Sequence, residues 1–247
     1  MIRNPLEQFE IVRLIPIRIG KVDISFTNAS LWMIMIVGMI GVMIVKSGRV
    51  IPGRWQSIWE GMYRVVVGMV YESIGKEIGG EMVGKVMGLF VFILGCNLAG
   101  LVPYSYTVTA QIVVTMMLAL GVWIGKLWVG VSRHGKELLG LFKPAGAPFA
   151  MIPFFVLLEV IGFIVPVISL SVRLFANMMS GHILLKVLFG FTWSMMLAGG
   201  WLYIGHIVSL GVLFLLLGLE TAVAIIQAYV FSLLTCVYIG EVVKGGH

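Results

Sequence analysis

The charged side chains that interrupt the apolar C-terminal half of the sequence are the residues best able to do chemistry. From Pro144 to the C-terminus the formally charged residues are Glu159, Arg173, Lys186, Glu220, Glu241 and Lys244. An ionisable side chain in an apolar helix costs roughly 2.5–3.5 kcal/mol on membrane-insertion scales, so each one is a functional candidate. Carboxylates exchange protons, whereas an arginine stays protonated. The combination favours a proton relay around a fixed positive charge.

A helical arrangement places several polar side chains on one face. At about 100° per residue, Arg173 and Asn177 lie about 40° apart, and Ser169 falls on the same face. Glu159 and Ser180 also fall within about 40° of Arg173. The spacing therefore predicts a polar stripe along an otherwise apolar helix.

The last apolar segment carries a matching stripe. Glu220 and Gln227 are about 20° out of alignment, and Glu241 lies roughly 31 Å beyond Glu220 along the axis. The two carboxylates are thus near opposite ends of the final span. Titratable groups that reach inward from both ends, with Arg173 between them, are typical of proton transport.

Other interpretations of these residues remain open. Glu159 and Arg173 also fit a structural ion pair, and Lys186 fits a side chain that reaches to the interface. His182 lies about 180° from Arg173 and faces elsewhere on a regular helix. If His182 and Glu220 share one cavity, they form a coupled titrating pair near neutral pH or contribute to a divalent-metal site. Two ligands are too few to predict a metal, and the pattern predicts no cofactor.

The composition identifies the class of protein that positions these residues. Of the 247 residues, 60% are hydrophobic and 11% are charged, whereas an ordinary globular chain is about 25% charged. Such a chain cannot cover a soluble surface. The 17 Lys and Arg exceed the 11 Asp and Glu, but they stand singly in connectors, which favours membrane topology over nucleic-acid binding. Cys96 and Cys236 lie in apolar runs and are interpreted as small hydrophobic residues.

Runs without charged residues predict the membrane spans. Residues 24–45, 86–125, 187–219 and 221–240 contain no Asp, Glu, Lys or Arg, and a helical span needs about 20 such residues. The predicted fold is an all-α polytopic membrane protein with one membrane domain over 1–247. Its predicted segments are an N-terminal segment 1–23, a first span 24–45, an amphipathic helix 55–80, a hairpin of 86–102 and 108–125, and long helices over about 148–188 and 200–243.

The connectors indicate the orientation. The hairpin tip at 103–107 lacks Lys and Arg, whereas the connectors on the other side contain several, so the positive-inside rule places the tip outside. Apolar residues at helical spacing in 55–80 predict a helix on the inner surface. Residues 79–86 have the glycine and lysine spacing of a phosphate loop but lack its Ser or Thr, so we expect no nucleotide binding.

Two motifs connect these residues to a known family. Residues 169–182 read SLSVRLFANMMSGH and residues 218–231 read GLETAVAIIQAYVF. Both closely resemble the signatures of ATP synthase subunit a, the proton-channel subunit of the Fo sector, in the right order and spacing. Residues 5–11 and 103–109 are similar to the plant-type mitochondrial version, and the resemblance covers nearly the whole chain.

The resemblance implies an architecture and partners. It implies one N-terminal span, an amphipathic surface helix, a hairpin, and two long tilted helices against a ring of c subunits. About 40 residues from Pro148 onward make roughly 60 Å of helix, too long for an upright span, so a tilt or a kink at Pro153 or Pro166 is expected. The implied partners are the c-ring, other Fo subunits including the peripheral stalk, membrane lipid and protons, without nucleic acid or bound nucleotide.

The resemblance also implies a role for each polar residue. Arg173 would attract the ionised c-ring carboxylate and keep two half-channels apart, with Asn177 and Gln227 beside it. His182 and Glu220 would belong to the inlet half-channel from the intermembrane space. Glu159 and Glu241 would line the outlet half-channel toward the matrix.

These implications have competitors from other functional classes. A purely structural subunit of a respiratory complex would use Glu159 and Arg173 as a static pair. An intramembrane protease would need a Ser–His or diacid pair, and the sequence offers no convincing one. We therefore expect a channel subunit that is not catalytic alone, in the mitochondrial inner membrane, with the N-terminus toward the intermembrane space and the C-terminus toward the matrix.

Overall fold

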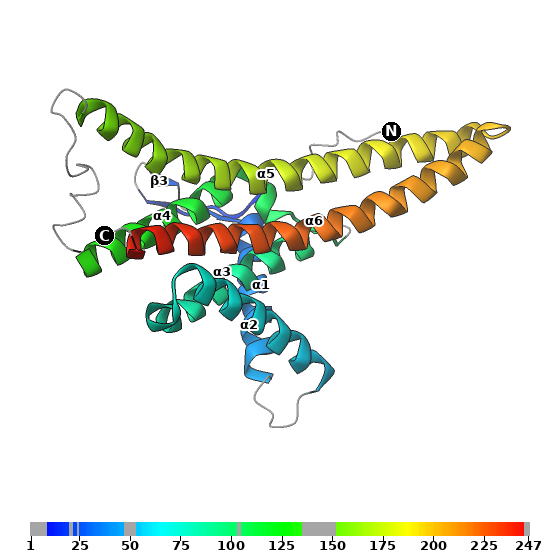
Figure 1. Ribbon diagram of the computed structural model, residues 1–247. Helices are drawn as coiled ribbons and strands as arrows, with labels where there is room; N and C mark the ends of the chain where they lie inside the picture. Colours follow the sequence, from blue (N-terminus) through cyan, green and yellow to red (C-terminus); the bar gives the residue numbers. More distant parts are fainter. Residues whose placement is uncertain are drawn as a thin grey trace. The chain divides into compact units, whose positions relative to one another are not determined.

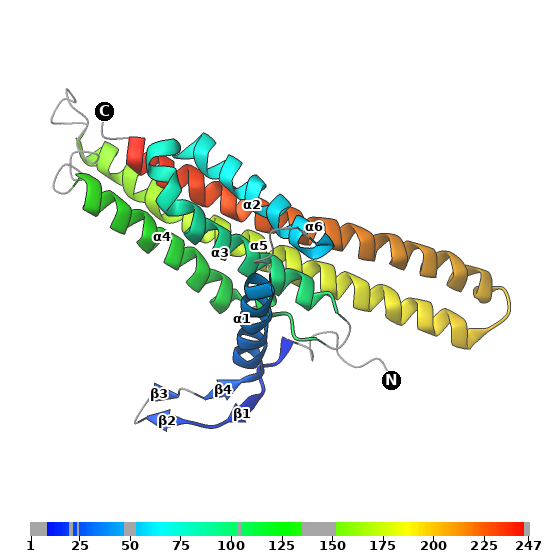
Figure 2. The same ribbon diagram turned by 90° about the horizontal axis from the view of Figure 1, so that it is seen from below.

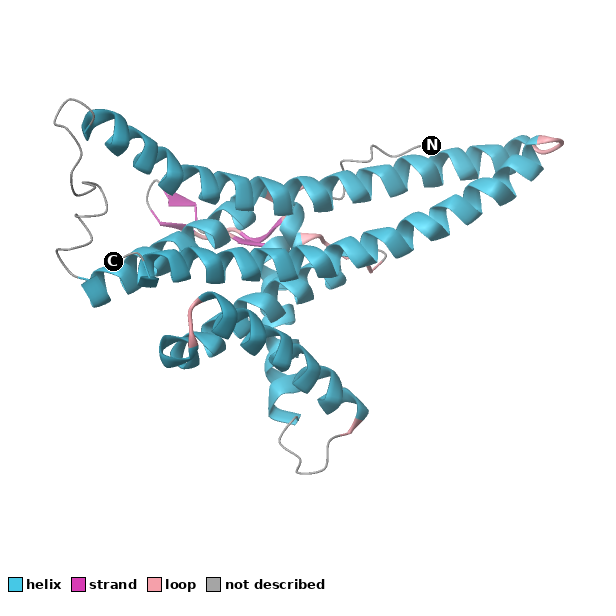
Figure 3. Ribbon diagram, viewed as in Figure 1, coloured by secondary structure: helices cyan, strands magenta, loops and turns pink. Residues whose placement is uncertain are grey.

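The protein is a helical membrane protein, as its computed structural model shows (Figure 1). The structure describes residues 9–19, 22–23, 25–46, 53–102, 105–134 and 152–244. The described helices are α1 (Asn28–Lys46), α2 (Arg54–Ser73), α3 (Lys76–Gly100), α4 (Ile112–His134), α5 (Ile152–Ala198) and α6 (Leu202–Lys244). Figure 3 shows how helix dominates these residues. The predicted all-α polytopic class is confirmed.

Length and hydropathy separate the membrane-crossing helices from the others. Within the described residues, four helices are long and apolar enough to cross a membrane: Lys76–Gly100, Ile112–Arg133, Ile164–Ala198 and Leu202–Val243. Asn28–Ile44, in the region of the expected first span, is apolar but shorter. The helix α2 is outside this set, in keeping with its charged positions.

The chain divides into two compact units. Unit 1 consists of Met1–Val42, Phe92–Gln111 and Leu174–Ala228, and unit 2 consists of Met43–Val91, Ile112–Arg173 and Tyr229–His247. Both long helices therefore contribute to each unit. The two units carry different groups of polar side chains.

Unit 1 begins with short strands that the sequence pattern did not predict. The strand β1 (Arg13–Ile15) pairs antiparallel with β4 (Phe26–Thr27), and β2 (Arg18–Ile19) pairs antiparallel with β3 (Val22–Asp23). Figure 2 shows both pairs before α1. Asn28 ties this segment to the start of α1, because its Nδ2 donates to Glu10 O at 3.2 Å. The segments are too short for a periodic signal to reveal them.

The parts of α5 and α6 in unit 1 form a hairpin, and hydrogen-bond contacts between polar groups connect its two helices. The C-terminal part of α5 and the N-terminal part of α6 lie side by side (Figures 1 and 2). Gly199 and Gly200 join them with φ of 67° and 64°, a conformation that suits glycine. Thr192 Oγ1 lies 2.6 Å from Ser209 Oγ, and His206 Nδ1 lies 3.0 Å from Thr192 O. This apolar-looking region thus contains a hydrogen-bonded cluster.

In unit 2 the expected amphipathic helix ends before residue 80. The helix α2 stops at Ser73, and α3 starts at Lys76 and continues to Gly100. Gly75 lies between them with φ of 100°, which other residues rarely adopt and which interrupts a right-handed helix. Gly240 of α6 packs against this break, because a Cβ there would lie 2.6 Å from the carbonyl oxygen of Ser73.

The lengths of α5 and α6 exclude upright spans. With 47 and 43 residues, the two helices measure roughly 70 and 65 Å, whereas the hydrocarbon core of a bilayer is about 30 Å thick. The helix α5 runs through Pro166 without a break in its assignment. The described helix is therefore not interrupted at Pro166, and a strong tilt is the expected way for this length to fit into a membrane.

Candidate functional site

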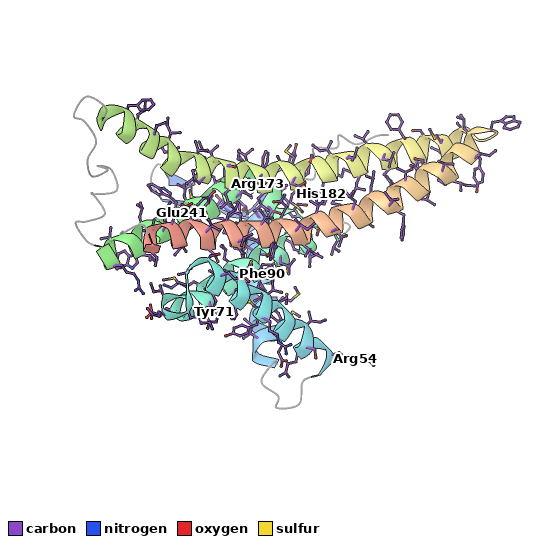
Figure 4. The ribbon with its side chains drawn as sticks, viewed as in Figure 1. Arg54, Tyr71, Phe90, Arg173, His182 and Glu241 are labelled. Atoms are coloured by element: carbon purple, nitrogen blue, oxygen red, sulfur yellow. The ribbon has the colours of Figure 1, made fainter. Side chains whose placement is uncertain are left out.

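The main polar site of unit 1 joins α5 and α6 through a histidine and a glutamate. His182 Nε2 lies 3.8 Å from Glu220 Oε1, and the two side chains are 12% and 7% exposed. Figure 4 shows His182 on α5. The structure therefore brings together the two residues that the sequence hypothesis placed in one cavity. This distance is longer than a direct hydrogen bond, so proton exchange between the two groups needs one bridging water molecule or a small side-chain motion.

Gly181 explains how the carboxyl group comes so close to α5. A Cβ at this position would lie 2.7 Å from Glu220 Oε1 and 3.0 Å from its Cδ, which is closer than real Cβ contacts allow. The missing side chain thus creates the space that Glu220 occupies. The sequence pattern gave Gly181 no role, because a glycine in an apolar helix does not reveal its neighbour.

We predict that Gly181→Ala displaces the Glu220 carboxyl group from His182. Proton transfer through this pair should slow by about tenfold or more, since a misplacement near 1 Å can be that costly. The measurement is the rate of proton flux into liposomes that contain the protein. Gly190→Ala is the matched control on α5, because nothing lies within 4 Å of a Cβ there. Equal rates in the two variants would contradict this placement.

Thr107 is a third member of the site and was not predicted. Its Oγ1 lies 3.2 Å from His182 Nε2, and its side chain is buried. The Phe9 ring meets the His182 ring edge-on at 6.4 Å between centroids. One imidazole nitrogen thus lies near both a hydroxyl and a carboxyl group, so its tautomer determines which of them it contacts as a donor or an acceptor.

Hydrogen bonds of Gln111 hold the segment that carries Thr107. Gln111 Nε2 donates at 2.8 Å to both Phe9 O and Tyr106 Oη. Burial raises the pKa of the Tyr106 phenol, and the hydrogen bond with Gln111 lowers it. Gly100 leaves room for Thr107, because a Cβ there would lie 2.8 Å from Thr107 Cγ2. These contacts connect the tip to the N-terminal segment.

Buried atoms without partners accumulate around Glu220. Within the described residues, both carboxyl oxygens of Glu220 and Oδ1 of Asn97 are buried and have no hydrogen-bond partner. Asn97 Nδ2 donates to Ala224 O at 3.1 Å, one turn beyond Glu220 on α6. Unpaired buried polar atoms are uncommon in native proteins and mark functional positions or water sites. Asn97 could have been noticed as an amide inside an uncharged run.

An open cavity of about 570 Å³ reaches Glu220. Asn177, Ser180 and Glu220 supply its polar lining, and Ser180 Oγ itself donates to Asn177 O at 3.2 Å. Most other lining residues are apolar. Gln227 is half-buried on the same helix as Glu220. The cavity is large enough for several water molecules.

Unit 2 contains Arg173, which is exposed. Its Nη2 donates to Ser169 Oγ at 3.5 Å, the one hydrogen bond that the described part of the chain provides to this guanidinium. Neighbouring Ser171 points elsewhere and lies 3.2 Å from Thr115 of α4. Figure 4 shows the position of Arg173 on α5. A permanent charge on an apolar helix with one long neutral hydrogen bond needs a further partner.

Of the two other predicted carboxylates, the structure describes the side chain of Glu241 but not that of Glu159. Glu241 is 60% exposed and its Oε2 lies 3.8 Å from Lys126 Nζ. The side chain of Glu159 lies outside the described residues, so a pair with Arg173 is neither supported nor contradicted. Lys126 was not among the predicted site residues.

The chain is similar to known proteins that carry the same name. The family model described as ATP synthase A chain matches residues 28–240. Similar proteins named ATP synthase subunit a occur in Chondrus crispus (43% identity, covering 98% of this chain and 96% of the relative) and Marchantia polymorpha (41%, 98% of each). Another occurs in Parvibaculum lavamentivorans (43%, 99% of this chain and 95% of the relative).

Proposed function

Because the chain belongs to the ATP synthase A chain family, we propose that it provides two proton half-channels to a ring of c subunits. Arg173 separates the half-channels. Other subunits of the complex make ATP. This subunit contributes proton transfer, without a cofactor of its own. Proton flow through it is coupled to rotation of the ring.

The exposure of Arg173 is the observation that carries this proposal. An arginine cannot lose its proton at working pH, and lipid would be an expensive environment for it. A c-ring carboxylate that passes this position would supply the opposite charge. It would bind in its ionised form and leave when it takes up a proton. A planar guanidinium suits such a carboxylate better than a point charge does.

The inlet half-channel is assigned to unit 1. The cavity next to Asn177 and Ser180 ends at Glu220, whose carboxyl oxygens are buried, so water would reach them after a small side-chain motion. His182 contacts Glu220 and Thr107, so a proton can pass between them with small side-chain motions. Gln227 and Asn177 are proposed to flank the path near the ring.

The outlet half-channel is assigned to unit 2, where Glu241 and Glu159 would release protons on the other side. Glu241 fits because its carboxyl group is largely exposed at the end of α6. The distribution of Lys and Arg in the connectors favours a matrix-facing C-terminus and an N-terminus toward the intermembrane space. The proposed membrane is the mitochondrial inner membrane, where the peripheral stalk and other Fo subunits would hold the subunit in place.

Site-specific cross-linking tests whether the face of Arg173 meets a c-ring. A photoreactive residue at Ala176, which is exposed on α5 and three positions after Arg173, should cross-link to c subunits in the assembled complex. The matched control is the same residue at Leu170, which is 4% exposed. Exclusive cross-linking of position 176 to lipid or to another subunit would contradict the proposal.

A further inference from the structure

Lys126 is a charged residue in unit 2 that the proposed proton path leaves unexplained. It lies within the apolar span Ile112–Arg133 of α4, eight residues before the helix ends at His134. Its side chain is 11% exposed. A buried ammonium is costly unless charges or dipoles surround it. The neighbours of Lys126 therefore show what this lysine does.

Two residues of α6 supply such neighbours. Lys126 Nζ lies 3.8 Å from Glu241 Oε2 and 5.5 Å from the centroid of the Tyr238 ring. Because Tyr238 and Glu241 are three positions apart, they lie on the same side of α6. The ammonium is thus attracted by a carboxylate and by an aromatic face. The carboxylate is the more exposed partner, since the side chain of Glu241 is 60% exposed and that of Lys126 is 11% exposed.

A small cavity adjoins this cluster. Its volume is about 20 Å³, and Lys126, Trp123, Tyr238 and Pro166 are among its lining residues. About 10–15 Å³ is enough for one water molecule. The indole Nε1 of Trp123 is buried and has no hydrogen-bond partner within the described residues. A water molecule in the cavity would accept hydrogen bonds from Trp123 Nε1 and from the Lys126 ammonium.

We propose that Lys126 is a positioning residue for Glu241 and that, together with Trp123, it holds one water molecule beside the outlet. The ion pair returns the exposed carboxylate to one place after each proton leaves it. The water connects the buried ammonium to a donor that otherwise lacks a partner. This inference rests on the proposed outlet role of Glu241.

Among the described residues, Lys126 is the cation that lies within ion-pair distance of Glu241. Tyr238 and Glu241 face it from α6, and the α5 residues that line the cavity, Pro166, Val167 and Leu170, are apolar. The backbone of Ser73 is the nearest part of α2 to Gly240 and carries no charge. Within the described residues, the Glu241 carboxylate has no other ion pair within 4 Å.

The test compares Lys126→Met with Lys126→Arg in the complete ATP synthase in liposomes. Loss of the pair should lower proton-driven ATP synthesis by about tenfold, the size typical of a coupled charge pair, and arginine should restore most of the rate. Lys85→Met is the matched control, because Lys85 is an exposed lysine on α3 of the same unit. A wild-type rate in Lys126→Met, or no rescue by arginine, would overturn the proposal.

A double variant separates positioning from a general loss of packing. If Lys126 acts through Glu241, then Lys126→Met adds little to the defect of Glu241→Gln. A double variant whose loss of synthesis equals the product of the two single losses would overturn the inference. Glu241→Gln with wild-type synthesis would instead show that the proposed outlet role is wrong, and this outcome is distinct from a failure of the lysine alone.

Direct observation keeps the inference testable if Lys126→Met does not assemble. A high-resolution density map of the unaltered complex should show Lys126 Nζ within ion-pair distance of Glu241 and a water molecule within hydrogen-bond distance of Trp123 Nε1. A lysine turned away from Glu241, or a cavity closed by side chains, would overturn it.

Discussion

Arg173→Ala should abolish proton-driven ATP synthesis by the assembled complex. In the proposed mechanism Arg173 is the one permanent charge that a c-ring carboxylate meets between the two half-channels. Among the described residues its guanidinium makes one long hydrogen bond, to Ser169 Oγ at 3.5 Å, so little of the described structure depends on it. Alanine leaves an uncharged helix face past which a carboxylate can carry protons in either direction. The complex should therefore assemble and conduct protons without coupling.

Arg173→Lys should fail as well, with a loss of synthesis of at least about tenfold. An ammonium on a flexible stem lacks the planar fork that matches a carboxylate, and it can lose its proton when buried. The measurements are the ATP synthesis rate and passive proton conductance of vesicles that contain equal amounts of complex.

Arg64→Ala is the control for removal of an exposed arginine. Arg64 lies on α2, where its guanidinium is 3.9 Å from Glu60, and this substitution should leave synthesis nearly unchanged. Preserved coupled synthesis in Arg173→Ala would contradict the assignment. A low rate caused only by absent complex would support the rival structural role.

Glu220→Gln should reduce proton-driven synthesis by about a hundredfold or more, within the range attributed to a positioned acid or base. The amide has nearly the same shape but cannot exchange a proton as a carboxyl group does. The cavity, the contact with α5 and the space above Gly181 would all remain. The defect would therefore lie in proton transfer, not in folding.

Thr221→Val is the matched control for Glu220→Gln. Thr221 is the next residue on α6, and its hydroxyl donates only to Leu217 O in the described structure, at 2.9 Å. Synthesis should remain close to the unaltered rate in this control. A fully active Glu220→Gln complex would remove Glu220 from the proton path.

The pH profile of His182→Gln distinguishes the role of His182 from that of Glu220. A histidine is the side chain that ordinarily changes charge between about pH 5 and 8, so its removal should change the pH profile of proton flux in that interval. The profile should be measured on both sides of the membrane. An unchanged profile would mean that His182 holds Glu220 in position without titrating.

Charges within apolar segments are the part of the proposed site that is visible in the sequence. Arg173 and Glu220 are visible because an unpaired charge is costly in a membrane helix. Residues 169–182 and 218–231 then specify the family, and the comparisons confirm that resemblance. The proximity of His182 and Glu220 also follows as a hypothesis, although neither periodicity nor spacing measures a distance across helices.

Neutral residues are the part that sequence patterns miss. Thr107 and Asn97 belong to uncharged runs, and their importance emerges only from neighbours far away in the sequence. Gly181 matters through an absent Cβ, and Gly75 through its backbone conformation. Lys126 is a charge, but it looked like the end of an uncharged run until α6 placed Glu241 beside it.

A density map of the assembled complex that resolves side chains around Arg173 is the most direct test of the mechanism. We expect the guanidinium to face the c-ring at the height of its proton-binding carboxylates, with the cavity of Glu220 opening on one side. An Arg173 that faces lipid, or that is held by a static partner away from the ring, would contradict it.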